Sequence, residues 1–129
     1  MTKARKAILK SLENVEEPIS ASELAKRLGD FCDPATVYRN LHYLEKNNLA
    51  TSFILHCSEH GTERYYSSKE GNEHHHWFHC EQCHRFIDLG GCFYAEQVRQ
   101  FEEKHAFTVH DHTFYLTGIC QRCKQKLGL

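Results

Sequence analysis

The amino-acid sequence predicts an α+β fold in which an N-terminal winged helix-turn-helix precedes a small α/β module with a four-cysteine zinc site. Three observations lead to this prediction. The first half contains three successive helix patterns, the second half contains two Cys-x-x-Cys pairs, and ten of the eleven histidines follow residue 55. We expect residues 1–68 to form the winged-helix domain, 69–73 a hinge, and 74–129 the metal-binding domain.

The composition is typical of a folded protein from a reducing compartment. Hydrophobic residues make up 40% of the 129 residues, enough for one ordinary domain or two small ones that share an interface. We find no apolar run of about 18 residues and no secretory leader, so we expect no membrane association and no export. The odd count of seven cysteines, with two Cys-x-x-Cys pairs, favours metal ligation in the cytoplasm over disulfides.

The first predicted helix runs from Thr2 to Asn14. Its apolar residues Ala7, Ile8 and Leu12 fall on one face, as expected for an amphipathic helix. The same segment carries a basic cluster, which consists of Lys3, Arg5, Lys6 and Lys10.

The second predicted helix begins at Ser20. Its hydroxyl can accept a hydrogen bond from the amide of Glu23 while the Glu23 side chain reaches back, which forms a capping box. Gly29 supplies the stop signal for this helix.

The third predicted helix runs from Pro34 to about Asn47. Asp33 is its N-cap, and proline is tolerated at the first helical position because its missing N–H is not needed there. Val37, Leu41 and Leu44 form a buried stripe. We expect the remaining large side chains to point away from the core: Tyr38, Arg39, Asn40, His42 and Tyr43.

A strand hairpin follows the three helices. Phe53–Leu55 and Tyr65–Tyr66, separated by a polar stretch with Gly61, predict its two strands. Two short helices joined by a tight turn and followed by a hairpin are the parts of a winged helix-turn-helix that binds DNA. A small three-helix domain without a DNA-binding role has the same pattern, and periodicity alone leaves both open.

The second half of the chain predicts a small α+β layer. We expect strands near Trp77–His79 and Phe86–Leu89, a helix from Phe93 to His105, and β structure within Phe107–Ile119. About 60 residues bury too little surface for stability without a staple or a partner subunit.

Four cysteines predict that a bound metal ion provides this stabilisation. Cys80, Cys83, Cys120 and Cys123 form two Cys-x-x-Cys pairs, and four thiolates satisfy tetrahedral Zn(II). Such a set leaves no open position, so the site is structural, and it would clamp the ends of a βαβ-type segment. The competing interpretation is a redox dithiol at one of the pairs.

Three cysteines are left over: Cys32, Cys57 and Cys92. Each can be a small buried residue. Metal ligation stays open for Cys57 and Cys92, because histidines lie close to them in the sequence.

The histidines suggest a further metal site. Because alternate residues of a strand share a face, His74 and His76 can converge on one metal while His75 faces the other way. His110 and His112 form a second same-face pair. The alternative is a solvated surface turn.

Taken together, the motifs of this chain resemble those of the ferric uptake regulator (Fur) family of metal-dependent bacterial repressors. The resemblance covers nearly the whole chain. It rests on Thr2-x-x-Arg5-x-x-Ile8-Leu9, Ser20-Ala21-x-Glu23-Leu24, Ala35-Thr36-Val37-Tyr38-Arg39-x-Leu41, His74-His75-His76 and the two cysteine pairs.

The resemblance implies that the helix from Pro34 lies in the major groove of operator DNA. Tyr38 would contact base methyl groups, and Arg39 phosphate or base. It also implies that the C-terminal module is the dimerisation domain, so that the chain acts as a homodimer. The remaining expected DNA contacts are Thr36, Asn40, Arg5 and Lys6.

The resemblance implies three metal sites, of which the structural site matches all four cysteines. The hinge site matches only at His75 and Asp88, because Trp77, Pro18 and Tyr66 replace its other ligands. If it is rebuilt, the wing could supply Cys57, His60 or Glu63.

The sensory site of the dimerisation domain matches better. Its positions hold His74, His76 and His112, with His76 in place of the more usual Asp. The second carboxylate position is Ala95, and we expect the adjacent Glu96 to serve instead.

The sequence thus predicts a metal-dependent transcriptional repressor of palindromic operators. A site with three histidines suits Zn(II), as in a zinc uptake regulator, while Fe(II), Mn(II) and Ni(II) stay open. The alternatives are an iron- or peroxide-responsive member of the same family and, in another class, a zinc-knuckle interaction module without DNA binding. We expect no enzyme and no small-molecule substrate, because the sequence has no HExxH motif and the four-thiolate site is closed.

Overall fold

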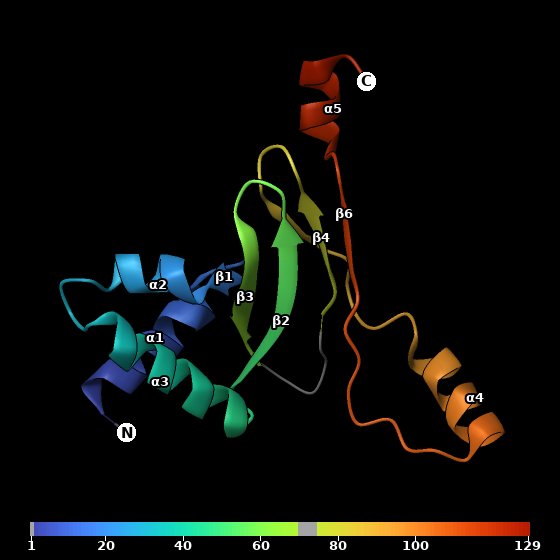
Figure 1. The fold of residues 1–129 in the computed structure, drawn as a ribbon, viewed down its shortest axis with the longest axis horizontal. Helices are drawn as coiled ribbons and strands as arrows, with labels where there is room; N and C mark the ends of the chain where they lie inside the picture. Colours follow the sequence, from blue (N-terminus) through green and yellow to red (C-terminus); the bar gives the residue numbers. More distant parts are fainter. Residues whose placement is uncertain (1, 70–74) are drawn as a thin grey trace. The chain divides into compact units, whose positions relative to one another are not determined.

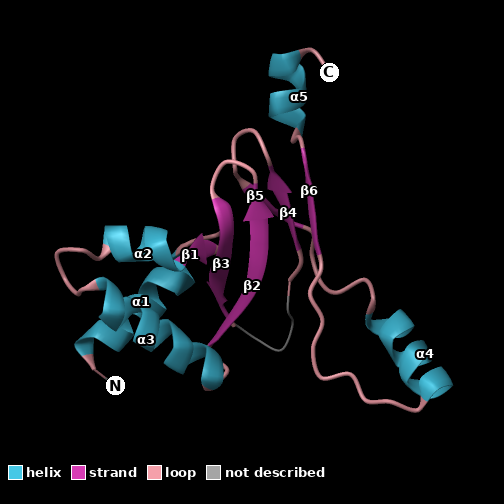
Figure 2. Ribbon diagram, viewed as in Figure 1, coloured by secondary structure: helices cyan, strands magenta, loops and turns pink. Residues whose placement is uncertain are grey.

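The chain divides into two compact units, Met1–Asn72 and Glu73–Leu129, in a computed structural model that describes residues 2–69 and 75–129 (Figure 1). Each unit contains helices and a small sheet of its own (Figure 2). The α+β class predicted from the sequence is confirmed. Within the described residues, none of the helices has the length and apolar character needed to cross a membrane.

The N-terminal unit contains three helices, and the N-caps predicted for the second and third are confirmed. They are α1 (Lys3–Asn14), α2 (Ala21–Arg27) and α3 (Pro34–Lys46). Thr2, Ser20 and Asp33 each accept a hydrogen bond from the amide three residues later. The capping box is only half formed, because the Glu23 carboxylate contacts Arg27 at 3.4 Å.

The core of the N-terminal unit lies where the three helices meet. The predicted stripe of α3 is confirmed, since Val37, Leu41 and Leu44 are fully buried. They pack in one cluster with residues of α1, α2 and the sheet, which include Ile8, Leu12, Leu24 and Tyr66.

The prediction that Asn40 points away from the core was wrong. Its side chain is only 6% exposed. On a helix, residues three and four apart share a face, so position 40 lies beside Val37 and Leu44. The polar atoms of Asn40 are satisfied inside the unit: its amide donates to the Thr36 carbonyl at 2.8 Å, and its oxygen accepts from Arg5 at 2.8 Å.

An antiparallel sheet completes the winged helix. Its order is β1 (Ile19–Ser20), β3 (Gly61–Ser68), β2 (Ala50–Cys57). The predicted hairpin is confirmed and is longer than expected, pairing from Ala50↔Ser68 to Cys57↔Gly61. The two-residue strand β1 was not predicted, because two residues are too few for a periodic pattern.

The C-terminal unit has a βαβ core. Strands β4 (Trp77–Cys80) and β6 (Tyr115–Gly118) are parallel neighbours, and α4 (Ala95–His105) lies in the connection between them. β5 (Phe86–Asp88) pairs antiparallel with the other side of β4, which gives the order β5-β4-β6. The βαβ-type segment predicted between the cysteine pairs is therefore confirmed.

The β structure predicted within Phe107–Ile119 is confined to strand β6, Tyr115–Gly118. The chain also ends in a helix that was not predicted, α5 (Gln121–Leu127), which stops where Gly128 adopts a left-handed conformation with φ of 74°. This helix is short and has few apolar residues, so its sequence shows no amphipathic pattern.

We predict that the core of the N-terminal unit is sensitive to the loss of one side chain. Replacing Leu41 by alanine removes a fully buried residue, and the free energy of unfolding should fall by about 2–5 kcal/mol. Urea unfolding of the zinc-loaded full chain, followed by helical circular dichroism, measures this. Tyr38→Ala on the exposed side of the same helix is the control and should cost about 0.5 kcal/mol. Equal losses would contradict the assigned faces of α3.

Candidate metal centres and nucleic-acid interface

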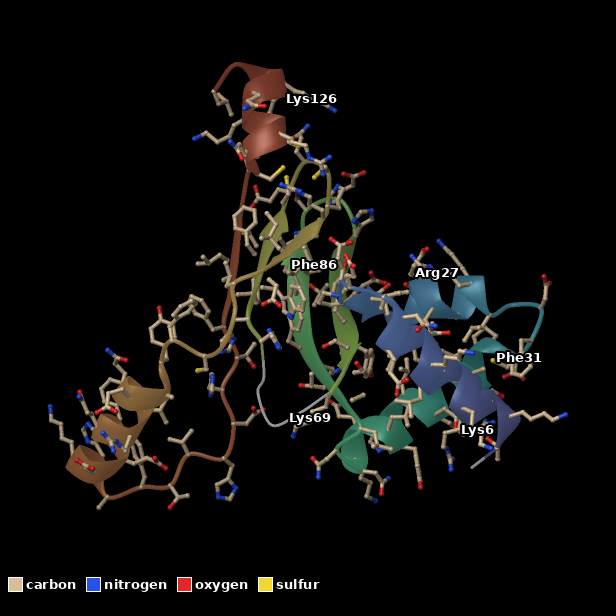
Figure 3. All side chains as sticks on the ribbon, turned by 180° about the vertical axis from the view of Figure 1, so that it is seen from behind. Lys6, Arg27, Phe31, Lys69, Phe86 and Lys126 are labelled. Atoms are coloured by element: carbon tan, nitrogen blue, oxygen red, sulfur yellow. The ribbon has the colours of Figure 1, made fainter. Side chains whose placement is uncertain are left out.

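The four paired cysteines come together in one cluster. Their sulfur atoms all lie within 4.8 Å of one another, and the Cys83 and Cys120 sulfurs are 3.8 Å apart. Figure 3 shows sulfur atoms gathered beside the start of α5. Zinc–sulfur bonds of about 2.3 Å in a tetrahedron give a sulfur–sulfur edge of about 3.8 Å, so this cluster fits a closed four-thiolate site.

The backbone prepares the cluster for a cation. The register Cys80↔Gly118 between the parallel strands brings the two pairs to the same end of the sheet. Although burial opposes ionisation of the Cys80 thiol, the amides of Cys83, Cys120 and Gln82 donate to its sulfur and lower its pKa to about 6. At Cys80 the backbone therefore favours the thiolate, which is the ligating form of cysteine.

A second cluster lies in the same unit and consists of His76, Cys92 and His112. The Nε2 atom of His112 is 3.2 Å from Nε2 of His76 and 3.2 Å from Sγ of Cys92. His76 is only 4% exposed, and burial lowers its pKa below the usual value. The other ring nitrogen of His76 lies 3.1 Å from the Phe114 carbonyl. A donor at that nitrogen leaves the lone pair of Nε2 directed at the cluster.

Local backbone structure brings Cys92 to the histidines. The Leu89 amide donates to the His76 carbonyl at 2.9 Å and continues the β4–β5 pairing by one residue. The chain then reverses at Gly90, whose φ of 89° is a conformation that favours glycine, and the Gly90 amide donates to the Asp88 carboxylate at 2.8 Å. Cys92 follows this turn directly.

The structure assembles part of the predicted sensory site. It brings His76 and His112 together, whereas His74 lies outside the described residues. Glu96 is not brought to them: its carboxylate accepts two hydrogen bonds from Arg99, at 2.5 and 2.6 Å. Cys92 lies beside them instead. The sequence left metal ligation open for Cys92, but it did not place this residue at the sensory site.

The candidates for the hinge site form two separate pairs. In the C-terminal unit, Nδ1 of His75 lies 2.9 Å from the Asp88 carboxylate, and both side chains are partly exposed. On the β2–β3 hairpin of the N-terminal unit, the sulfur of Cys57 lies 3.8 Å from Nδ1 of His60. Each pair has donors that a metal could use, and each lies within one unit.

The residues that replace the other hinge ligands have structural roles. Pro18, Tyr66 and Trp77 are buried. Glu63, the remaining wing candidate, accepts a hydrogen bond from the Ser22 hydroxyl at 2.7 Å and so ties the hairpin to α2.

The exposed side of α3 borders an open hollow of about 800 Å³. Tyr38 is 49% exposed there, and Arg39 is exposed beside it with its guanidinium 3.2 Å from the Thr36 hydroxyl. Lys6 is exposed on α1 (Figure 3). The hollow is lined by Thr2, Ala4, Arg5, Thr36, Tyr38, Arg39, Asn40, His42 and Tyr43.

Arg5 links α1 to α3 at this surface. Its Nε donates to the Asn40 oxygen at 2.8 Å, and its guanidinium carbon lies 3.6 Å from the centre of the Tyr43 ring. These contacts orient a cation at the surface and make Asn40 a residue that positions Arg5.

Comparison with known proteins finds consistent similarity. Residues 1–117 match the model of the Ferric uptake regulator family. The Ferric uptake regulation protein of Vibrio parahaemolyticus is 31% identical over 126 residues, which cover 91% of this chain and 81% of that protein. The ferric uptake regulator of Vibrio cholerae has a TM-score of 0.70 at 27% identity, over 93% of this chain and 91% of its own. A zinc uptake regulator solved with zinc and DNA has a TM-score of 0.72 at 18% identity, over 99% and 85%, and is similar in fold alone.

We predict that the four-cysteine cluster holds zinc tightly. Cys120→Ser should lower the zinc content by about one atom per chain, because serine does not replace a thiolate in such a site. Elemental analysis of the protein after gel filtration measures the loss. Cys32→Ser changes a cysteine packed on the other unit's core and should keep the zinc. A Cys120→Ser protein with unchanged zinc would contradict the assignment.

Proposed function

The chain belongs to the ferric uptake regulator family, and from this premise we propose that it is a zinc-dependent transcriptional repressor. It binds palindromic operator DNA as a homodimer when a metal site distinct from the four-thiolate cluster is loaded. The observation that carries this proposal is the approach of the His76 and His112 ring nitrogens to 3.2 Å, next to a separate and closed cysteine cluster.

The exposed side of α3 is the DNA-reading surface in this proposal. Tyr38 offers an aromatic edge to thymine methyl groups, and Arg39 offers a fork of N–H donors to phosphate or guanine. Thr36 is positioned beside Arg39. Arg5 and Lys6 add positive charge from α1.

A second copy of the chain is the partner that the C-terminal unit requires. Its helix α4 has no buried residue. The large apolar side chains of this unit that are exposed include Phe93, Phe101, Phe107 and Leu116. A unit of this size gains stability by burying such a surface against an identical one, and a two-fold dimer matches a palindromic operator.

Zinc is the metal that suits the histidine pair best. Imidazole nitrogen is a good ligand for Zn(II), whereas Mn(II) favours oxygen donors. A bound zinc ion would supply a positive charge and fixed coordination directions at this site. The residues do the remaining work: His76 holds its Nε2 toward the site through the Phe114 carbonyl, and His112 approaches from the segment before β6. Metal can favour the DNA-binding state only by binding that state more tightly.

We predict that Tyr38 and Arg39 are needed to bind DNA. Metal-loaded protein is first used to enrich a binding duplex from a random-sequence pool, and that duplex is then titrated with each variant. Tyr38→Ala combined with Arg39→Ala should abolish specific binding, and Arg39→Ala alone should lower the salt slope by about one. Lys126→Ala, an exposed cation on α5, is the control and should bind normally. If no palindrome is enriched, the chain is an interaction module instead.

We further predict that zinc controls this binding. Removal of labile metal with a mild chelator should weaken binding to the enriched duplex, and added Zn(II) should restore it. Fluorescence anisotropy against free metal concentration measures the response, with Fe(II) and Mn(II) titrated in parallel. Restoration by Fe(II) but not by Zn(II) would indicate the iron-responsive alternative. Binding that is independent of every metal would refute the proposal.

A further inference from the structure

We propose that Cys92 is the third protein ligand of the metal site at His76 and His112, and that its thiolate makes this site selective for thiophilic divalent ions such as Zn(II). This inference rests on the proposed function, because it concerns the same regulatory site. It goes further by assigning a ligand of a different chemical class from the carboxylate that the sequence led us to expect at Glu96.

The distances in the cluster match the edges of a coordination tetrahedron. Zinc–nitrogen bonds of about 2.05 Å give a nitrogen–nitrogen edge of about 3.3 Å, and a zinc–sulfur bond of about 2.3 Å gives a nitrogen–sulfur edge of about 3.6 Å. The two Nε2 atoms are 3.2 Å apart, and Sγ of Cys92 is 3.2 Å from Nε2 of His112. All three ligand atoms lie within 4.8 Å of one another, and the two edges at His112 are close to those of a coordination tetrahedron.

A thiol–imidazole hydrogen bond alone accounts less well for this arrangement. The contact between His76 and the Phe114 carbonyl places the proton of His76 on Nδ1, so Nε2 has a lone pair directed at His112. Nε2 of His112 faces that lone pair and the Cys92 sulfur at once. A single metal ion can bind the lone pairs of all three ligand atoms at once, whereas a single proton forms a hydrogen bond across only one of the two contacts.

The surroundings of the cluster are suited to a bound ion. His76 is buried, and its ring packs edge-on against Phe114 with centroids 5.6 Å apart. Tyr94 packs in turn against Phe114, with ring centroids 4.9 Å apart. The burial of His76 limits water at this ligand, which strengthens charge interactions there. Among the described residues these three are the ligands brought together, and His74, which the sequence also predicts for this site, lies outside them.

The thiolate sets the preference among metals. Sulfur ligands favour Zn(II) and other soft or borderline ions, and carboxylates favour Mn(II) and Mg(II). A site with two imidazoles and one thiolate therefore discriminates against Mn(II) more strongly than the same site with a carboxylate. In this chain Glu96 is engaged with Arg99, so its carboxylate does not offset that preference.

Cobalt(II) is the spectroscopic probe for this ligand. Full-length protein is stripped of labile metal with a mild chelator, keeps its zinc in the four-thiolate cluster, and is titrated with Co(II) while its zinc content is monitored. Wild type should give thiolate-to-cobalt charge-transfer absorption with the visible bands of a four-coordinate ion. Cys92→Ser should lose the charge-transfer band and bind Zn(II) at least about tenfold more weakly. Cys92→Asp should recover binding with a preference shifted toward Mn(II). Cys32→Ser is the matched cysteine control and should behave like wild type.

The outcomes separate this inference from the proposed function. Two results together would refute Cys92 as a ligand: Co(II) binds without a charge-transfer band, and Cys92→Ser keeps wild-type zinc affinity and zinc-dependent DNA binding. The proposed repressor function would be unaffected by these results. If no labile metal binds and DNA binding is independent of metal, both are refuted. Retained zinc throughout the titration shows that the cobalt signal does not come from the four-cysteine cluster.

Discussion

The parallel pairing of β4 with β6 is the constraint on which the C-terminal unit depends. It sets Cys80 opposite Gly118, so the two cysteine pairs meet, and it sets Trp77 opposite Tyr115, so His76 lies beside Phe114. Both metal clusters therefore use the same strand register. A shift by one residue would turn every side chain of β4 to the other face and separate both sets of ligands.

The same pairing needs stabilisation from outside the hydrophobic core. The buried cluster around it consists of Cys80, Cys120 and Cys123, with a few partly buried apolar neighbours. Without metal, each thiol opposes the ionisation of its neighbours. Burial together with the neighbouring thiols raises the pKa of Cys123 to about 12. A zinc ion bound here would join the four sulfurs, and its binding energy would contribute to folding. It would also hold the strand register on which the geometry of His76 and His112 depends.

Local signals in the sequence predicted most of the fold. Helix caps such as Ser20 and Asp33, the stripe from Val37 to Leu44 and the two cysteine pairs act over short distances, so they can be recognised without the structure. Cys92 and Asn40 could not be placed in this way. The position of Cys92 depends on a glycine turn and on its contact with His112, 20 residues later. Asn40 lies on the helix face of Val37 and Leu44, and the polar contact that satisfies its oxygen there comes from Arg5, 35 residues earlier.

The recognition helix is held by contacts that need no metal, and this limits how metal can control DNA binding. α3 packs through Val37, Leu41 and Leu44 on the helices around it, and Arg5 ties its outer side to α1. In the described part of the chain, no residue of α1, α2 or α3 belongs to a group of potential metal ligands. Metal therefore has little means to reshape the reading surface itself. In the proposed repressor, control would therefore act on how two copies of that surface are presented to the half-sites of a palindrome, since half-site spacing is fixed by the geometry of a dimer.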